Sequence, residues 1–119
     1  MAAIKSCTGI EQSRKLAEFL PHESAGMCFI AHSELINIHE PFYKKADKED
    51  IPCWSLAALL GVLPKFDAEE PMVRKLYYAN EPKERYICQY NLTNMTSEYD
   101  NPVDACYEMI LKLNELNLL

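Results

Sequence analysis

The stretch that decides the fold is NPVDACYEMILKLNEL, residues 101–116. Asn101 is a good helix N-cap, Pro102 fits the first helical position, and Asp104 places a carboxylate in the first turn. Apolar side chains then recur at helical spacing, at Val103, Cys106, Tyr107, Met109, Ile110, Leu113 and Leu116. We therefore predict an amphipathic C-terminal helix whose apolar face needs a partner surface.

The polar side of this helix carries Glu108, Lys112 and Glu115. Glu108 and Lys112 stand four residues apart in the order that stabilises a helix, so we expect an ion pair between them. For the apolar side, the two most apolar partners in the chain are residues 51–64 and a predicted β-hairpin.

Residues 51–64, IPCWSLAALLGVLP, are the most apolar stretch of the chain. Pro52 fits the first turn of a helix, and Pro64 ends it. We predict a helix here that is largely buried, since its apolar residues leave only a narrow polar side.

The predicted hairpin consists of residues 73–78 and 85–92, which are rich in β-branched and aromatic residues. Turn-forming residues fill positions 79–84 between them. The second run alternates, which predicts one buried and one wetter face: Tyr86, Cys88 and Tyr90 against Ile87 and Gln89.

In the N-terminal half, the sequence predicts one helix and two short strands. Residues 10–20 have an apolar side and a cap at Thr8 or Gly9, which indicates a helix. Residues 27–31 form a short continuous apolar run, which favours a buried strand, and residues 35–39 partly alternate and are suited to pair with it. A second helix in place of these two strands stays open.

These elements predict an α+β fold with about three helices packed on a short antiparallel β-hairpin or sheet. The length of 119 residues fits a single domain, residues 1–119. No apolar run approaches the ~20 residues that cross a bilayer, and no signal-peptide region is visible near the start. We expect a cytoplasmic protein with no membrane partner.

The five cysteines are odd in number and widely spaced, at Cys7, Cys28, Cys53, Cys88 and Cys106. With no export signal, this pattern favours free thiols that pack as small apolar side chains over a disulfide framework.

The formal net charge is −6, and acidic residues are spread over both halves of the chain. A phosphate backbone needs a basic face, so nucleic acid is not the expected partner. Two versions of a nucleic-acid-related regulator nevertheless stay open. One is an acidic surface that mimics nucleic acid, and the other is a local basic surface around Arg74, Lys75, Lys83 and Arg85.

Catalytic and metal-binding patterns are weak. Cys53 lies near the start of the predicted helix, where a thiolate is favoured, but nothing in the sequence brings a histidine to it. Cys28, His32 and His39 lack the spacing of a zinc site. The acidic cluster at residues 47–50 lacks the glycine and distal glutamate of a calcium loop. We expect no cofactor, no metal and no catalytic residues, and an enzyme whose site is assembled from distant residues is the third hypothesis.

Four of the seven tyrosines gather in the predicted hairpin: Tyr77, Tyr78, Tyr86 and Tyr90. Aromatic pairs across strands stabilise hairpins, so packing explains them. Tyrosine is also enriched in protein interfaces, so the same residues are the candidate protein-interaction face.

Three segments in this order carry a family resemblance: residues 10–16 with 23–27, residues 51–60, and residues 100–110. The set resembles small uncharacterised proteins of bacteroides-type bacteria and their phages or prophages. That group tends to have Ala-Asp-Met where this chain has Ala25-Gly26-Met27. The resemblance implies a phage or mobile-element accessory protein and no chemistry. Our leading hypothesis is a non-enzymatic accessory protein that binds another protein or self-associates.

Overall fold

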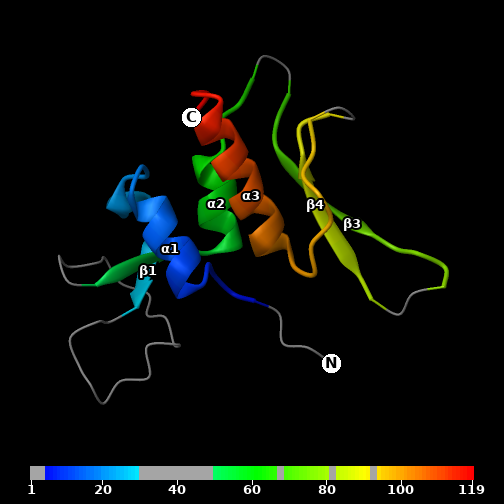
Figure 1. Ribbon diagram of the computed structural model, residues 1–119, viewed down its shortest axis with the longest axis horizontal. Helices are drawn as coiled ribbons and strands as arrows, with labels where there is room; N and C mark the ends of the chain where they lie inside the picture. Colours follow the sequence, from blue (N-terminus) through cyan, green and yellow to red (C-terminus); the bar gives the residue numbers. More distant parts are fainter. Residues whose placement is uncertain (1–4, 30–49, 67–68, 81–82, 92–93) are drawn as a thin grey trace. The chain divides into compact units, whose positions relative to one another are not determined.

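The computed structural model shows an α+β protein, as the sequence predicts. It describes residues 5–29, 50–66, 69–80, 83–91 and 94–119 (Figure 1). These residues form three α-helices, one short 3-10 helix and two two-stranded antiparallel sheets. Within them, no helix is long and apolar enough to cross a membrane. Contacts divide the chain into two compact units, residues 6–58 and residues 59–119 with Lys5, which we describe separately. The single-domain organisation stays a prediction.

The sheet of the first unit is built around β2 (Ile51–Trp54). β1 (Gly26–Phe29) runs antiparallel along one edge, with Met27 opposite Cys53. On the other edge, the backbone N–H of Thr8 donates to the carbonyl of Trp54 at 2.9 Å. β2 is therefore the middle of three extended segments, which explains why its last three residues are buried.

The predicted helix over residues 51–64 is wrong in its first part. Residues 51–54 form a strand, and α2 (Leu56–Val62) begins only after Ser55, whose hydroxyl accepts from the backbone N–H of Ala58. The apolar run and Pro52 are compatible with either structure locally. Pairing with β1 and with the segment at Thr8 selects the strand. α2 is also less buried than expected, since Leu59 is its one fully buried residue.

The predicted N-terminal helix is confirmed as α1 (Ile10–Ala17), which packs on β2. Gly9 is its N-cap, and the backbone N–H of Gly9 donates to the side chain of Gln12 at 2.9 Å. The helix stops short of residue 20.

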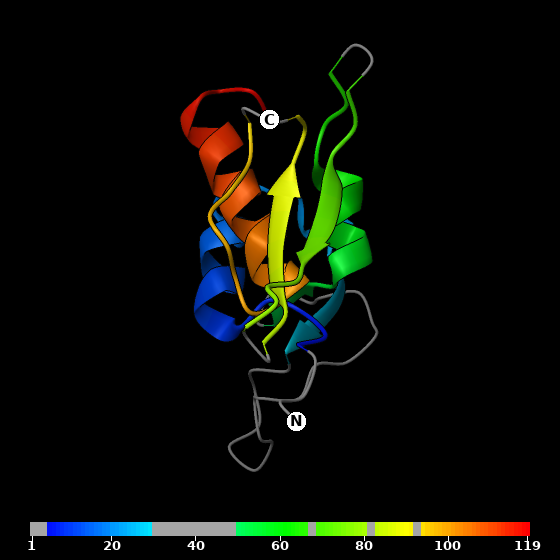
Figure 2. The same cartoon turned by 90° about the vertical axis from the view of Figure 1, so that its right-hand side faces the viewer.

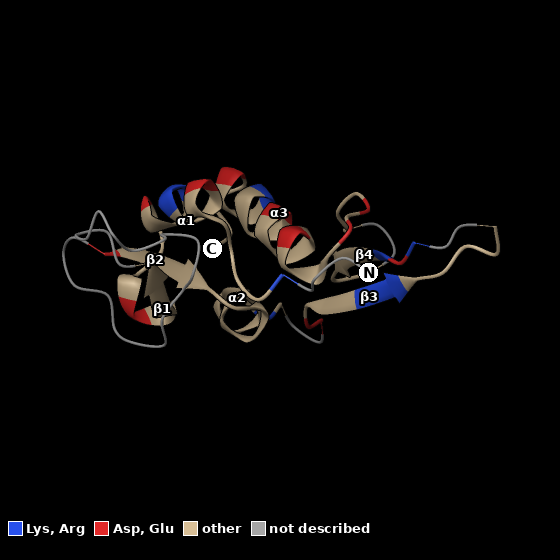
Figure 3. Ribbon diagram, turned by 90° about the horizontal axis from the view of Figure 1, so that it is seen from below, with Lys and Arg blue, Asp and Glu red and all other residues tan. Residues whose placement is uncertain are grey.

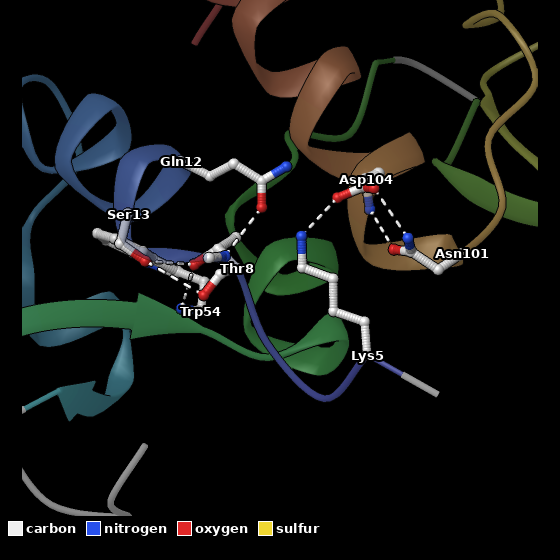
Figure 4. Close-up of polar contacts among 8 residues, drawn as sticks. Lys5, Thr8, Gln12, Ser13, Trp54, Asn101 and Asp104 are labelled. Atoms are coloured by element: carbon white, nitrogen blue, oxygen red, sulfur yellow. Dashed lines mark hydrogen bonds and ion pairs between the residues drawn. The ribbon is translucent and has the colours of Figure 1, made fainter. Parts of the chain in front are cut away.

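A buried polar network ties α1 to β2 (Figure 4). The Thr8 and Ser13 hydroxyls are hydrogen-bonded at 2.8 Å, and the Thr8 hydroxyl also accepts the backbone N–H of Trp54 at 3.0 Å. All three residues are fully buried, so these bonds replace the water that each polar group loses on folding.

The strand predicted within residues 27–31 is confirmed as β1, and its partner among the described residues is β2. Residues 35–39, the partner suggested by the sequence, lie outside the described residues. β1 follows a short 3-10 helix, η1 (His22–Ser24), through Gly26, whose φ is +70°. Residues with a side chain rarely adopt this backbone, which gives a physical reason for glycine at this position.

The second unit contains the predicted hairpin, β3 (Met72–Leu76) and β4 (Arg85–Gln89). The strands pair antiparallel, with Arg74 opposite Ile87. The chain then turns and runs back along the other edge of β4, where Tyr86 and Tyr99 exchange both backbone hydrogen bonds (Figure 2). β4 is thus the central segment. The predicted wetter face is wrong for residues 87–90, because all four are buried.

The C-terminal helix is confirmed as α3 (Pro102–Glu115), and it packs on β4 and β3. The Asn101 side chain accepts the backbone N–H of Asp104, as the sequence predicts (Figure 4). Its buried face consists of Val103, Ala105, Cys106, Met109, Ile110 and Leu113. The expected hairpin partner is confirmed.

The predicted ion pair between Glu108 and Lys112 is absent from the described part of the chain. The ion pair that α3 does form joins Asp104 to Lys5, with Nζ and Oδ1 2.7 Å apart. Lys112 therefore has no carboxylate partner among the described residues.

Candidate functional site: an apolar cavity beside α3

A cavity of about 220 Å³ lies in the second unit, against the C-terminal half of α3. Its lining is mainly apolar, with three polar residues. The nine lining residues are Phe66, Glu69, Tyr90, Asn94, Met109, Lys112, Leu113, Leu116 and Leu118. Four of them occupy one face of α3 at positions 109, 112, 113 and 116, the spacing that brings side chains together along a helix.

The floor of the cavity is buried and its edge is open. Met109 and Leu113 are buried, whereas Leu116 is 57% exposed and Leu118 is also exposed. Exposed apolar side chains that lie together, rather than singly, mark a surface that binds something, and Leu116 and Leu118 line the same cavity.

The end of α3 explains why Leu118 belongs to this cavity. Asn117 adopts a left-handed backbone with φ 57°, and the backbone N–H of Leu118 then donates to the carbonyl of Leu113 at 2.9 Å. This is the Schellman arrangement, in which an apolar residue just past the helix folds back beside the last turn. The cavity wall is therefore part of the helix cap.

Aromatic rings form the opposite wall. Phe66 and Tyr90 pack edge to face, with ring centroids 5.2 Å apart, and the Tyr90 hydroxyl donates to the Pro64 carbonyl at 2.6 Å. Burial, together with the neighbouring Cys88 and Cys106 thiols, raises the pKa of Tyr90 to about 12. The tyrosine is therefore neutral near pH 7 and serves as a fixed wall.

The polar edge is partly occupied by internal bonds. The Asn91 amide donates to both carboxylate oxygens of Glu69, at 3.1 and 3.0 Å. The Asn91 side-chain oxygen also accepts the backbone N–H of Asn94 at 2.8 Å. These bonds hold Glu69 in place, so Lys112 is the charged group of the edge that has no bonded partner in the described chain.

Two buried thiols lie near Tyr90. Cys88 on β4 and Cys106 on α3 are fully buried and hydrogen-bonded to each other. That bond lowers the pKa of the Cys88 thiol and raises that of Cys106, whose pKa burial raises further. All five cysteines are free and buried, which confirms the sequence prediction.

The four predicted interface tyrosines do not share one environment. Tyr77 and Tyr78 are 72% and 45% exposed, just after β3, and the Tyr78 hydroxyl donates to Glu98. Tyr86 is half-buried and donates to Glu84 at 3.0 Å. Tyr90 is buried in the cavity wall. Tyr77 and Tyr78 are therefore the exposed part of the proposed face, and its role as an interface stays a prediction.

The predicted basic surface is partly neutralised. Lys75 pairs with Glu84 at 2.9 Å and lies over the Tyr77 ring at 5.3 Å. Arg74 and Lys83 are exposed. Figure 3 shows positive charge on β3, while acidic residues follow the outer side of α3.

The catalytic and metal candidates gain no support from the geometry. Cys53 lies in β2, three residues before α2 begins and outside its first turn, and is fully buried. A hydrogen bond with Cys7, burial and the charges of Cys7 and Cys28 all raise its pKa, which opposes thiolate formation. In the described part of the chain, no three His, Cys, Asp or Glu side chains are placed to hold a metal ion. His32, His39, Asp47 and Glu49 lie outside it.

Comparison with known proteins found no matching family model, no matching curated protein and no matching solved structure. The cavity was also missed by sequence reasoning, which did not single out Phe66, Glu69 or Leu118. Two features of the sequence could have indicated the cavity wall on α3: the helical spacing of Met109, Lys112 and Leu116, and Asn117 just past the helix.

Proposed function

We propose that this protein is a non-enzymatic binding protein, and that the free edge of β3 pairs with an extended acidic segment of another protein. The observation that carries the proposal is a combination of three features of one hairpin: a strand edge and an arginine that have no partner among the described residues, and an exposed aromatic pair. Each of the three contributes a different part of recognition.

The edge provides backbone hydrogen bonds. β3 pairs with β4 on one side, and no described segment pairs with its other side. A strand edge of this kind presents N–H and C=O groups that an incoming extended segment can satisfy.

The charge selects the class of partner. Arg74 lies in the middle of β3, is exposed, and forms no ion pair with the described residues. A second copy that paired antiparallel about this position would place the two Arg74 side chains opposite each other, which is destabilising. A partner strand that carries glutamate or aspartate there would gain a cross-strand ion pair instead, so we favour another protein over self-association.

The aromatic pair supplies apolar contact area next to the edge. Tyr77 follows β3 directly and keeps most of its surface in water, and Tyr78 is also exposed. Tyrosine and arginine dominate the few residues that carry most of the binding energy in interfaces. We expect Arg74 and Tyr77 to be these residues here.

The biological context and the cellular location that we propose rest on the sequence alone. The resemblance to phage and prophage proteins supports an accessory protein of a mobile element, and the composition supports a cytoplasmic location. The nucleic-acid alternative is less favoured, because the net charge is −6 and Lys75 is already paired.

The first test uses two labelled hexapeptides, Glu-Val-Glu-Val-Glu-Val and Lys-Val-Lys-Val-Lys-Val, and fluorescence polarisation. We expect the acidic peptide to bind more tightly, and Arg74→Glu to reverse that preference. Arg14→Glu, on the exposed side of α1, is the matched control and should change neither affinity. Equal binding of both peptides, or no binding of the acidic one, contradicts the proposal.

The second test uses the protein as bait in extracts of host cells that carry the parent element. A genuine partner should be captured by the native chain and by Arg14→Glu, and lost with Arg74→Glu and Tyr77→Ala. Hydrogen exchange of the β3 amides should slow in the complex. Light scattering should show a monomer when no partner is added, and a dimer that dissociates with Tyr77→Ala would assign the edge to a second copy instead.

A further inference from the structure

The size of the cavity beside α3 limits what can enter it. Its volume of about 220 Å³ exceeds the roughly 150 Å³ of an apolar cavity that holds benzene, and it is below the roughly 300 Å³ at which drug-sized pockets begin. One aromatic ring or a short alkyl chain fits this range.

The walls are formed before any ligand arrives. The Phe66 and Tyr90 rings are held by their mutual contact and by the bond to Pro64, and Leu118 is placed by the helix cap. A site that is already ordered loses little conformational entropy when a ligand binds, which favours even a small ligand.

The edge of the cavity distinguishes between charged groups. Glu69 has both carboxylate oxygens bonded to Asn91, so it offers little to a cation. Lys112 is exposed, lies on the lining face of α3, and has no ion pair with any described residue, although Glu108 and Glu115 are near it in sequence. An ammonium group beside an apolar cavity suits an anion attached to an apolar body.

We propose that this cavity binds a small amphiphilic carboxylate, with its ring or alkyl chain between α3 and the aromatic wall and its carboxylate at the Lys112 ammonium. This site is separate from the β3 edge and does not depend on the proposed function. The binding is non-covalent, so it requires no further reactant.

The test uses three probes of the same shape: 3-phenylpropionate, its neutral amide and 3-phenylpropylamine. Methyl signals of Met109, Leu113, Leu116 and Leu118 are followed by NMR during titration. We expect saturable shifts at these methyls with 3-phenylpropionate and a Kd on the order of 1 mM, as suits a ligand of this size. The amide should bind roughly two- to fivefold more weakly, and the amine more weakly still.

Two variants separate the charge from the cavity. Lys112→Gln should weaken 3-phenylpropionate roughly two- to fivefold and leave the amide unchanged. Leu116→Glu changes an exposed position of the lining and should reverse the order of anion and amine. Lys15→Gln, an exposed lysine of α1, is the matched control and should change nothing.

Three results would overturn the assignment. The first is the absence of saturable shifts at the lining methyls up to tens of millimolar probe. The second is equal affinity for the carboxylate and the amide in the native chain. The third is a carboxylate preference that survives both Lys112→Gln and Leu116→Glu.

Discussion

Asn101 and Asp104 bind each other twice across the first turn of α3. The backbone N–H of Asp104 donates to Asn101 Oδ1, and Asn101 Nδ2 donates to Asp104 Oδ2, both at 2.8 Å. Asp104 also receives Lys5 Nζ at 2.7 Å. The first turn of α3 is thus stabilised by the side chains of Asn101, Asp104 and Lys5.

Replacing Asn101 with alanine should lower the free energy of unfolding by about 1 kcal/mol, because one N–H group of the first turn then lacks an acceptor. Urea unfolding followed by circular dichroism measures this change. Asn101→Ser keeps a good N-cap acceptor without placing a second carboxylate beside Asp104, and it is the control. Equal losses in the two variants would mean that the cap bond contributes little.

Leu113 and Leu116 lie one turn apart on α3 but differ in exposure, at 5% and 57%. Leu113→Asp should destabilise the protein by more than about 3 kcal/mol or unfold it, because a carboxylate would replace an apolar group in the core. Leu116→Asp should stay within about 1 kcal/mol of the native chain. Thermal unfolding of the pair tests this, and similar melting temperatures would contradict the burial assigned to Leu113.

Thr8→Val should destabilise the protein by roughly 1–3 kcal/mol, because it leaves the buried N–H of Trp54 without its side-chain acceptor and the Ser13 hydroxyl with only its long bond to the Thr8 carbonyl, at 3.4 Å. Ser13→Ala alone should cost less, and the double variant should cost less than the sum. A double-mutant cycle in urea measures that coupling. Strict additivity would show that the two hydroxyls do not act together.

Tyr90 should make the protein less stable at alkaline pH. Burial holds its pKa at about 12 in the folded state, against about 10 in an unfolded chain. The unfolded state therefore loses its proton first. The stabilisation is complete below pH 10 and falls by up to about 3 kcal/mol as the pH rises to 12.

Tyr90→Phe isolates this effect. The variant loses the bond to Pro64 at every pH, yet it should lack the tyrosine part of the alkaline decline. Other groups also ionise in this range, so the measured quantity is the difference between the two unfolding curves from pH 9 to 12. Parallel curves would contradict the raised pKa.

Because the thiols are buried, we expect them to react slowly with thiol reagents in the native protein. All five cysteines are free and buried, so a thiol reagent should titrate five groups per chain in denaturant and react slowly with the native protein. Fast reaction of any thiol in the native state would contradict its burial.

The sequence by itself determined those helices and strands whose caps, turns and apolar periods act within a few residues of the chain. The cap of α3, the period of its apolar residues and the turn formers of the hairpin act within a few residues, so α3, β3 and β4 could be predicted with nearly the right bounds. α1 was predicted for the same reason. The α+β class followed from these elements.

Tertiary structure alone decided the strand at residues 51–54, the burial of Tyr90 and the cavity beside α3. Residues 51–54 become a strand because Gly26–Phe29 and Thr8, distant in sequence, supply backbone partners on both edges. Tyr90 is buried whereas Tyr77 is exposed, because α3 packs on β4 and because Phe66 and Pro64 contact Tyr90. The cavity needs Phe66, Tyr90 and Leu118 to converge from three segments. Local preferences determined the caps and periods, and contacts between distant segments determined which apolar runs became strands and which surfaces stayed open.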